Sequence, residues 1–114
     1  MAAKRDDLVY VDDILDALGR IKKYCEDVKK DEFTGNDMLR DAVVRNLEII
    51  GEASSRLNES FREKHKELEW RKIIGMRNRI IHAYDIVDYA VVWDVVKMDL
   101  PQLEAKLRKL AKPE

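Results

Sequence analysis

The chain has 114 residues, of which 46% are apolar and 39% charged, and its formal net charge is −1. This length predicts one domain spanning residues 1–114, and the apolar content is too high for a disordered chain. A net charge so close to zero excludes a global attraction to nucleic acid, so any contact with RNA or DNA must come from a local basic patch.

The single cysteine, Cys25, excludes a disulfide framework and a thiolate metal cluster, and it fits a reducing compartment. The N-terminal stretch "MAAKRDDLVY" lacks the apolar core of a signal peptide. No apolar run approaches the roughly 20 residues that a membrane-spanning helix needs. We therefore expect a soluble, cytoplasmic protein with no membrane partner.

In the first half of the chain, apolar residues recur at intervals of three and four, which is typical of amphipathic helices. A first helix is predicted over 8–28, with the stripe Leu8, Val11, Leu15, Leu18, Ile21, Cys25 and Val28. "DEFTGND" then interrupts the pattern, and Thr34 followed by Asp37 resembles a helix-opening cap. A second helix is predicted over 39–57, with the stripe Leu39, Val43, Leu47, Ile50, Ala53 and Leu57.

The second half of the chain predicts two further helices. "NESFREKHKE" is interpreted as a short helical turn or a loop, and a helix follows from about Glu69 to about His82. Asp85 or Asp88 can cap the last helix, in which Pro101 predicts a kink or a break near Leu100. The stripe of this helix comprises Val92, Val96, Leu100, Leu103, Leu107 and Leu110. The predicted fold class is all-α, an antiparallel bundle of four to five helices.

A helix over 69–82 would place Arg77 among apolar side chains. With about 100° of rotation per residue, Arg77 falls inside the stripe of Ile74 and Ile81. The expected solvent side carries Arg71, Lys72 and Arg79. An unpaired guanidinium in apolar surroundings is costly, so Arg77 needs a partner, a subunit interface or a polar cleft. A snorkelling arginine at a packing edge, or a buried ion pair, is the alternative.

Charged residues of the second helix are candidate partners of Arg77. Arg45, Glu48, Glu52 and Arg56 lie within about 60° of one another on that helix. Arg45, Glu48 and Glu52 are therefore candidates for binding or orienting a substrate. The simpler interpretation is a solvated face of ion pairs spaced three and four residues apart.

His82 would lie about 140° around a regular helix from Arg77, so one chain could not easily converge both side chains on one small group. A two-fold axis beside this helix would bring a second Arg77 and His82 against the first pair. Asn78 precedes His82 by four residues, so it can bind substrate or orient the imidazole. Alternatively, His82 is a C-terminal helix histidine favoured by the macrodipole.

These residues resemble the R-x4-6-H motif of HEPN domains: Arg77, four intervening residues and His82 match it, and Tyr84 extends the match to R-x4-H-x-Y. Three stretches resemble the HepT-like branch: "AVVRNLEIIGEA" (42–53), "WRKIIGMRNRIIHAY" (70–84) and "VWDVVKMDLPQL" (92–103). The short motif alone is weak. Three stretches in the right order in a helical chain make the resemblance strong.

The resemblance implies an all-helical homodimer with its cleft at the dimer interface, and a metal-independent endoribonuclease with Arg77 and His82 as the catalytic pair. It also implies a toxin of a type VII-like toxin–antitoxin system. The partner would be a minimal nucleotidyltransferase (MNT) antitoxin that transfers AMP to Tyr84 and silences the nuclease. The alternative for Tyr84 is a helix-end packing residue with a solvent-facing hydroxyl.

The implied chemistry suits these residue types. RNA carries its own nucleophile, the 2′-hydroxyl, and histidine suits the proton transfer while arginine offers a fork for phosphate oxygens. No metal or other cofactor is expected, because His65 and His82 lie apart from any ligand pattern. Two competing hypotheses remain: a non-catalytic dimeric module that binds nucleotide or its partner, and a plain structural bundle, which leaves Arg77 unexplained.

Overall fold

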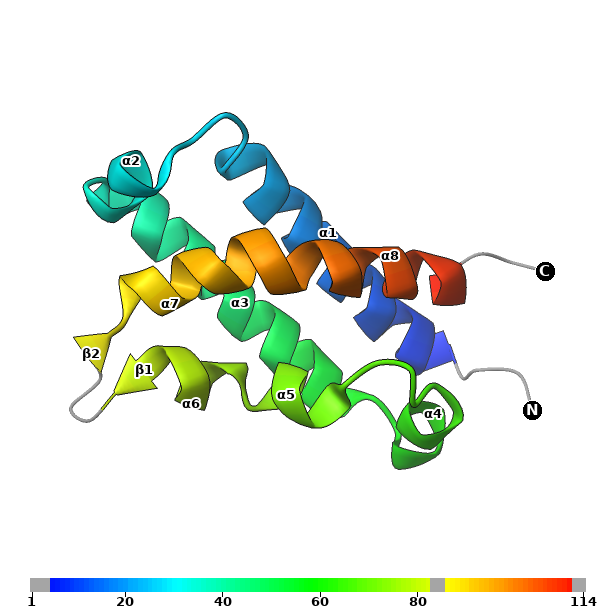
Figure 1. Ribbon diagram of the computed structural model, residues 1–114. Helices are drawn as coiled ribbons and strands as arrows, with labels where there is room; N and C mark the ends of the chain where they lie inside the picture. The colour runs from blue at the N-terminus through cyan, green and yellow to red at the C-terminus, as the bar shows by residue number, and fades with distance from the viewer. Residues whose placement is uncertain (1–4, 83–85, 112–114) are drawn as a thin grey trace.

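The computed structural model describes residues 5–82 and 86–111, and within them it is built almost entirely of helices (Figure 1). The long helical segments are α1 (Arg5–Tyr24), α3 (Asp37–Arg56) and a continuous rod of α7 (Tyr89–Asp94), η2 (Val95–Asp99) and α8 (Leu100–Ala111). The short helices are α2 (Lys30–Thr34), α4 (Glu59–Lys64), α5 (Trp70–Ile74) and α6 (Met76–Ile80). Two strands of two residues each, β1 (Ile81–His82) and β2 (Ile86–Val87), complete these segments. The predicted helical fold class is confirmed, whereas α2, the strands and the division of the helix predicted over 69–82 were not foreseen.

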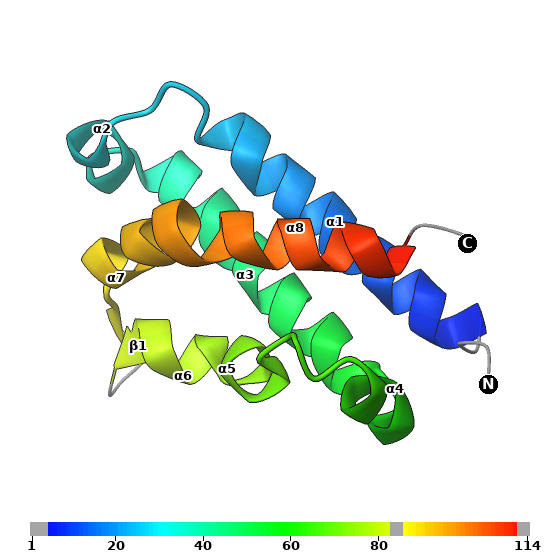
Figure 2. The same cartoon turned by 45° about the vertical axis from the view of Figure 1, so that its right-hand side comes forward.

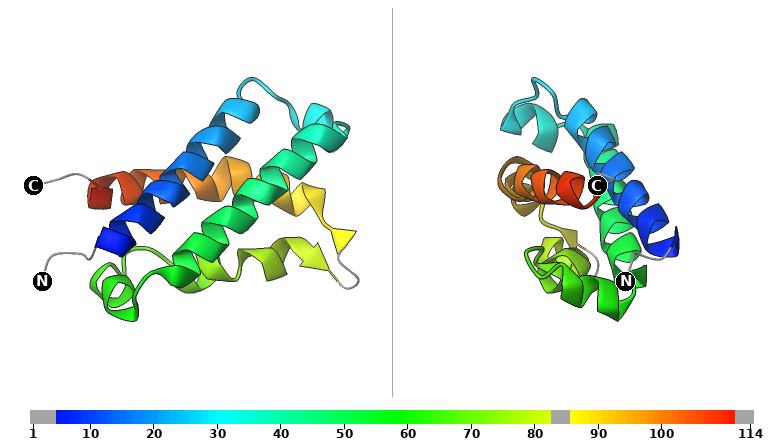
Figure 3. Two further views of the ribbon diagram at one scale, coloured as in Figure 1. Left: turned by 180° about the vertical axis from the view of Figure 1, so that it is seen from behind. Right: turned by 90° about the vertical axis from the view of Figure 1, so that its right-hand side faces the viewer.

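The helices form two layers. Helices α1 and α3 lie side by side as one layer, and the rod and the α4–α6 segment cover one side of it (Figure 3). Figure 2 shows the rod crossing α1 and α3. The core between the layers is apolar, and its fully buried side chains include Ile14, Phe33, Leu47, Ile50, Ile80 and Leu107. No helix in the described ranges is both long and apolar enough to cross a membrane.

Apart from Leu8, which is 44% exposed, the residues of the stripes predicted for the first two helices lie in the core or pack against it, but the helix ends differ from the prediction. Helix α1 ends at Tyr24 rather than at Val28, and the chain then turns through Asp27, whose φ is 58°. Asn36, not Thr34, caps α3, because its side-chain oxygen accepts a hydrogen bond from the Leu39 N–H at 3.0 Å. Thr34 is instead the last residue of α2.

Pro101 does not break the last helix, although it does disturb it. The rod continues through Leu100, and the turn before it widens into the π-helix η2 over Val95–Asp99. Proline has no N–H, and its ring crowds the carbonyl four residues earlier, so a wider turn relieves both problems. The Gln102 side chain donates to the Met98 carbonyl at 3.2 Å, which satisfies an acceptor in the disturbed turn.

Asp88 caps the rod, as one of the two predicted candidates. Its carboxylate accepts a hydrogen bond from the Val91 N–H at 3.2 Å. The other candidate, Asp85, lies outside the described residues. This cap fixes where α7 begins, only one residue after β2, and so ties the strand pair to the rod.

Candidate active site

The segment that carries the motif is a five-residue helix between a glycine break and a strand. Gly75 ends α5 and precedes α6, with φ −83° and ψ 8°. A Cβ built on Gly75 would lie 3.1 Å from the Arg71 carbonyl oxygen, which is closer than side chains normally approach. The chain therefore passes tightly from α5 to α6, and the single helix predicted from Glu69 to His82 is wrong.

Helix α6 is held by its two apolar residues. Ile80 is fully buried and Met76 is 5% exposed, so both ends of this short helix are anchored in the core. Burying side chains of this size stabilises their position by about 1.5–3 kcal/mol each. The Ile80 carbonyl also accepts a hydrogen bond from the Asp88 N–H at 2.8 Å. Helix α6 is thus fixed to the core on one side and to the start of the rod on the other.

The chain leaves α6 directly into strand β1, which pairs with β2 in antiparallel register. Ile81 lies opposite Val87, and His82 lies opposite Ile86. The backbone of His82 is therefore extended, not helical, and the alternative of a helix C-terminal histidine does not apply. Tyr84 lies outside the described residues.

Arg77 is exposed, not part of the apolar stripe, so its predicted placement is wrong. The buried positions along α5 and α6 are Trp70, Ile73, Met76 and Ile80. Because the chain turns at Gly75 and becomes extended at Ile81, a helical projection over 70–84 assigns the wrong residues to the core. Asn78 and Arg79 are exposed as well, so α6 presents three successive polar side chains.

The exposure of Arg77 and the end of α6 at Ile80 remove the geometric reason for a two-fold axis. The predicted separation of about 140° between Arg77 and His82 assumed a regular helix, which ends at Ile80. Arg77 does not need a second subunit to remove it from a closed core. A homodimer consequently stays a prediction that rests on the family resemblance.

Two ion pairs hold charged side chains of the α5–α6 segment. Arg79 pairs with Asp99 at the end of η2, and both side chains are partly exposed. Lys72 pairs with Glu69 at 3.2 Å within the turn that opens α5. The first pair adds a polar contact between α6 and the rod. Exposed pairs of this kind contribute about 0–1 kcal/mol, so they orient side chains more than they stabilise the fold.

The charged row predicted on the second helix lies on α3, and most of its side chains face solvent, as the simpler interpretation expected. Glu52 and Arg56 form an ion pair at 3.1 Å, and both side chains are more than half exposed. The pKa of Arg56 is raised, first by its hydrogen bond to Glu52 and then by one to Tyr10 of α1. Glu48 is half-buried and Arg45 is exposed.

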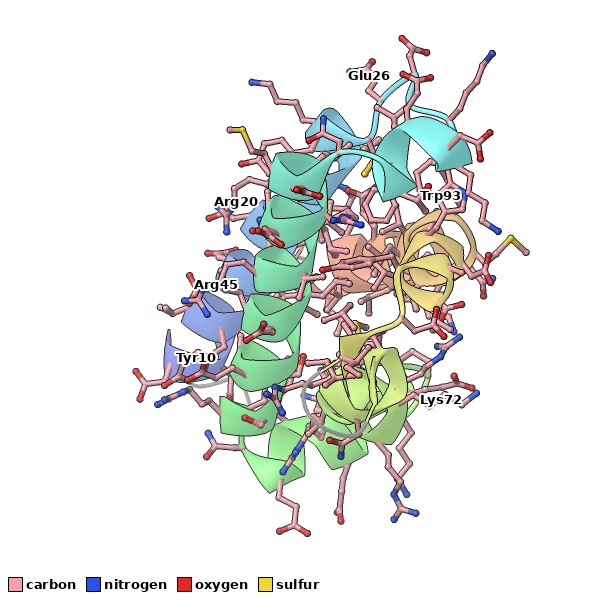
Figure 4. The ribbon with its side chains drawn as sticks, turned by 90° about the vertical axis from the view of Figure 1, so that its left-hand side faces the viewer. Tyr10, Arg20, Glu26, Arg45, Lys72 and Trp93 are labelled. Carbon is pink, nitrogen blue, oxygen red and sulfur yellow. The ribbon has the colours of Figure 1, made fainter. Side chains whose placement is uncertain are left out.

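Arg45 projects from the side of α3 away from the α5 helix that carries Lys72 (Figure 4). The structure therefore does not bring Arg45 together with α6 within one chain. A role for Arg45, Glu48 and Glu52 in substrate orientation stays a prediction.

Sequence reasoning missed one arginine that contacts the start of the rod. Arg40 of α3 lies over the Tyr89 ring of α7, 4.2 Å from its centroid. It also donates to the Thr34 carbonyl at 2.9 Å and pairs with Asp37. This side chain joins α2, α3 and the first turn of the rod just after β2. The spacing of Asp37 and Arg40 on a helix was a readable signal, whereas the contact with Tyr89 was not.

Among residues 5–82 and 86–111, no group of three histidine, cysteine, aspartate or glutamate side chains lies together in a way that could hold a metal ion. His65 is paired with Glu67 at 3.5 Å, and its backbone carbonyl accepts the Trp70 indole N–H at 2.9 Å. His65 therefore belongs to the packing of α4 against α5, away from the motif.

The chain is similar to known proteins over most of its length. The family description "Ribonuclease HepT-like" matches residues 14–110, which is most of the chain. The chain belongs to the HepT-like ribonuclease family. The match contains the whole of α3, the α5–α6 segment with Arg77, and the strand with His82.

Several relatives of this HepT-like chain are similar along nearly their whole length. A candidate RNase of Methanocaldococcus jannaschii is 40% identical over 105 residues, which cover 92% of this chain and 96% of that protein. The probable ribonuclease HepT of Thermococcus cleftensis is 39% identical over 109 residues, covering 96% of this chain and 99% of that one. A candidate RNase of Caldanaerobacter subterraneus is 34% identical over 105 residues, covering 92% and 94%. No solved structure matches the chain significantly.

Proposed function

We propose that this HepT-like chain is a metal-independent endoribonuclease in which Arg77 binds the scissile phosphate and His82 transfers the proton. The observation that carries the proposal is the exposed Arg77 on a helix whose other face is buried, immediately before the strand that contains His82. The helix that carries Arg77 is anchored, so the guanidinium can donate hydrogen bonds to a phosphate without a loop first having to become ordered. The family match and the names of the relatives support ribonuclease chemistry.

The proposed reaction needs only groups present in RNA and in this chain. The neutral imidazole of His82 removes the proton from a 2′-hydroxyl, and the resulting oxygen attacks the adjacent phosphorus. Arg77 stabilises the negative charge that builds on the phosphoryl oxygens. The bond from phosphorus to the 5′-oxygen breaks, and that oxygen takes a proton from the protonated imidazole of His82. The products are a 2′,3′-cyclic phosphate and a free 5′-hydroxyl.

The first experiment is cleavage of a defined RNA in excess EDTA by the purified protein. The proposal expects cleavage, and it expects products that end in a cyclic phosphate. The same oligonucleotide with deoxyribose at the cleaved position should resist cleavage, because it lacks the nucleophile. Cleavage of that deoxy-substituted bond, or cleavage only with added divalent metal, would contradict the mechanism. RNA binding without cleavage would instead favour a non-catalytic binding module.

We further propose that the protein is the toxin of a type VII-like toxin–antitoxin pair. An MNT nucleotidyltransferase antitoxin would add AMP to Tyr84, two residues beyond His82 in the sequence. The added phosphodiester would bring a negative charge close to the motif and compete with RNA phosphate for Arg77. Tyr84→Phe keeps the ring and removes the acceptor oxygen, so it should cleave RNA yet escape this control.

Intact mass after incubation with the nucleotidyltransferase and ATP tests the assignment. Wild type should gain one or more AMP units, and Tyr84→Phe should gain none. A chain with Tyr10→Phe is the matched control, because Tyr10 lies on α1 far along the sequence from the motif. Equal modification of Tyr84→Phe and wild type would place the acceptor elsewhere.

We also propose that the active form is a homodimer with Arg77 near its two-fold axis. A stable interface of this kind should bury more than about 1,000 Å² in total. Light scattering at micromolar concentration should give twice the mass of one chain. A monomer at that concentration, with cleavage intact, would show that one chain suffices.

A further inference from the structure

We propose that the hollow between the α5–α6 segment and the rod is a subsite for a nucleotide that lies beyond the two joined by the cleaved bond. The inference rests on the proposed function, since it names a second place where the same RNA is held. The hollow has a volume of about 430 Å³, which lies within the range of small-molecule sites. Its lining includes Met76 and Arg79 of α6, and Leu100, Leu103 and Lys106 of α8.

The floor of this hollow is apolar. Met76 and Leu100 are each 5% exposed, and Leu103 is 8% exposed. All three side chains are almost fully buried, so they form a firm surface and not a flexible flap. The face of a nucleobase can lie on such a surface, because every base has an apolar π-face. The Met76 thioether adds a polarisable contact that tolerates different bases.

The rim of the hollow is basic. It carries Lys72, Arg79 and Lys106 against Glu69 and Asp99. Both carboxylates are already paired, Glu69 with Lys72 at 3.2 Å and Asp99 with Arg79. Within the described part of the chain, Lys106 has no such pair, so its ammonium is a positive charge on the rim that no carboxylate neutralises. A basic rim over an apolar floor matches a nucleotide, which has a phosphate and a flat base.

The position of the hollow relative to Arg77 indicates how the RNA would have to run. Arg77 and Arg79 are two residues apart on α6, so their side chains point about 160° away from each other. Arg79 lines the hollow, whereas Arg77 does not. The scissile phosphate at Arg77 and the nucleotide in the hollow would therefore lie on different sides of a helix about 10 Å across. A strand of RNA that passes around α6 reaches both, so the hollow should affect substrate binding and not the chemical step.

The test is charge reversal of Lys106 with a matched control on the same helix. Lys106→Glu places a carboxylate on the rim, whereas Lys109→Glu makes the same change at another exposed position of α8 that does not line the hollow. Lys106→Glu should raise KM for an RNA of ten or more nucleotides about tenfold and leave kcat unchanged. Lys109→Glu should change KM less than about twofold. A dinucleotide, which has no nucleotide beyond the two joined by the cleaved bond, should show no change with either variant.

The salt dependence gives a second readout that a folding defect would not imitate. Loss of one phosphate contact to single-stranded RNA should lower the slope of log K against log salt by about 0.7. Lys106→Ala should show that decrease and Lys109→Ala should not. Circular dichroism melting of each variant confirms that the fold is unchanged.

Binding of a fully 2′-O-methylated RNA separates this proposal from the proposed nuclease, because that RNA binds but cannot be cleaved. If wild type fails to cleave RNA, yet Lys106→Glu alone weakens binding of this probe, the subsite stands and the nuclease fails. Equal weakening by both reversals, or by neither, overturns the subsite. Binding of free AMP that depends on Lys106, with RNA binding unaffected, would also overturn it in favour of a mononucleotide site.

Discussion

Ile80 is the buried residue that most directly holds the proposed site, since it lies between Arg77 and His82 and is fully buried. Ile80→Ala removes three carbons. At about 0.8 kcal/mol per buried methylene, the transfer term alone is about 2.4 kcal/mol. The cavity left behind adds to it, so the total cost should fall within about 2–5 kcal/mol. Since a domain of this size has about 5–15 kcal/mol of stability, the variant should lose a large part of it, and its urea midpoint should fall clearly below that of wild type.

Ile86→Ala is the matched control, because Ile86 belongs to the same strand pair and is 63% exposed. It should cost less than about 0.5 kcal/mol. Urea unfolding followed by circular dichroism gives both values, provided that the slope of the free energy of unfolding against urea is unchanged. Equal effects of the two substitutions, or a cost for Ile80→Ala below about 0.5 kcal/mol, would refute the claim that α6 is anchored in the core through Ile80.

Two further predictions concern residues outside the motif. Asp7 is 3% exposed, and its carboxylate accepts hydrogen bonds from the backbone N–H of Asn58 at 3.0 Å and from the Asn58 side-chain amide. Asp7→Asn should therefore destabilise the fold by about 1–3 kcal/mol. Asp6→Asn, at an exposed position, should have little effect in the same urea titration. Burial raises the pKa of the Cys25 thiol, so iodoacetamide should alkylate it much more slowly in the folded protein than in urea. Because the pKa is raised by folding, the buried neutral thiol contributes fully to the free energy of unfolding below the unfolded pKa of about 8.5. That contribution declines as the pH rises from there through the folded pKa. Cys25→Ala should remove that part of the alkaline loss, and an unchanged stability profile above pH 8.5 would contradict it.

The sequence could predict what depends on local periodicity. The stripes of α1 and α3 determined their packing faces, and Asp88 was readable as a cap because aspartate accepts well at that position. The exposure of Arg71, Lys72 and Arg79 also followed from spacing. These features arise from residues within one or two turns of each other, so no knowledge of the tertiary fold was needed.

The sequence could not predict what depends on distant partners or on a local change of period. A glycine within a run of helical spacing is compatible with a continuous helix, so the division at Gly75 was not visible. The strand pair that contains the backbone of His82 requires residues on both sides of a reversal to meet. The hydrogen bonds of Asp7 to Asn58 join residues 51 apart in the sequence. For the same reason, the hollow bordered by Lys106 and Arg79 emerges only when the rod and the α5–α6 segment meet in the fold.

Cleavage of one RNA in excess EDTA by Arg77→Ala, His82→Ala and His65→Ala tests the central claim most directly. His82→Ala should lower the rate about 10²–10⁴-fold by removing the proton transfer, and Arg77→Ala should cost a comparable factor by removing phosphate stabilisation. His65→Ala is the control, since it removes the other histidine of the chain, which packs against Phe61 in α4. It should cleave at nearly the rate of wild type under conditions where all four proteins are folded. Unchanged cleavage by Arg77→Ala and His82→Ala would contradict the account and place the activity outside this motif.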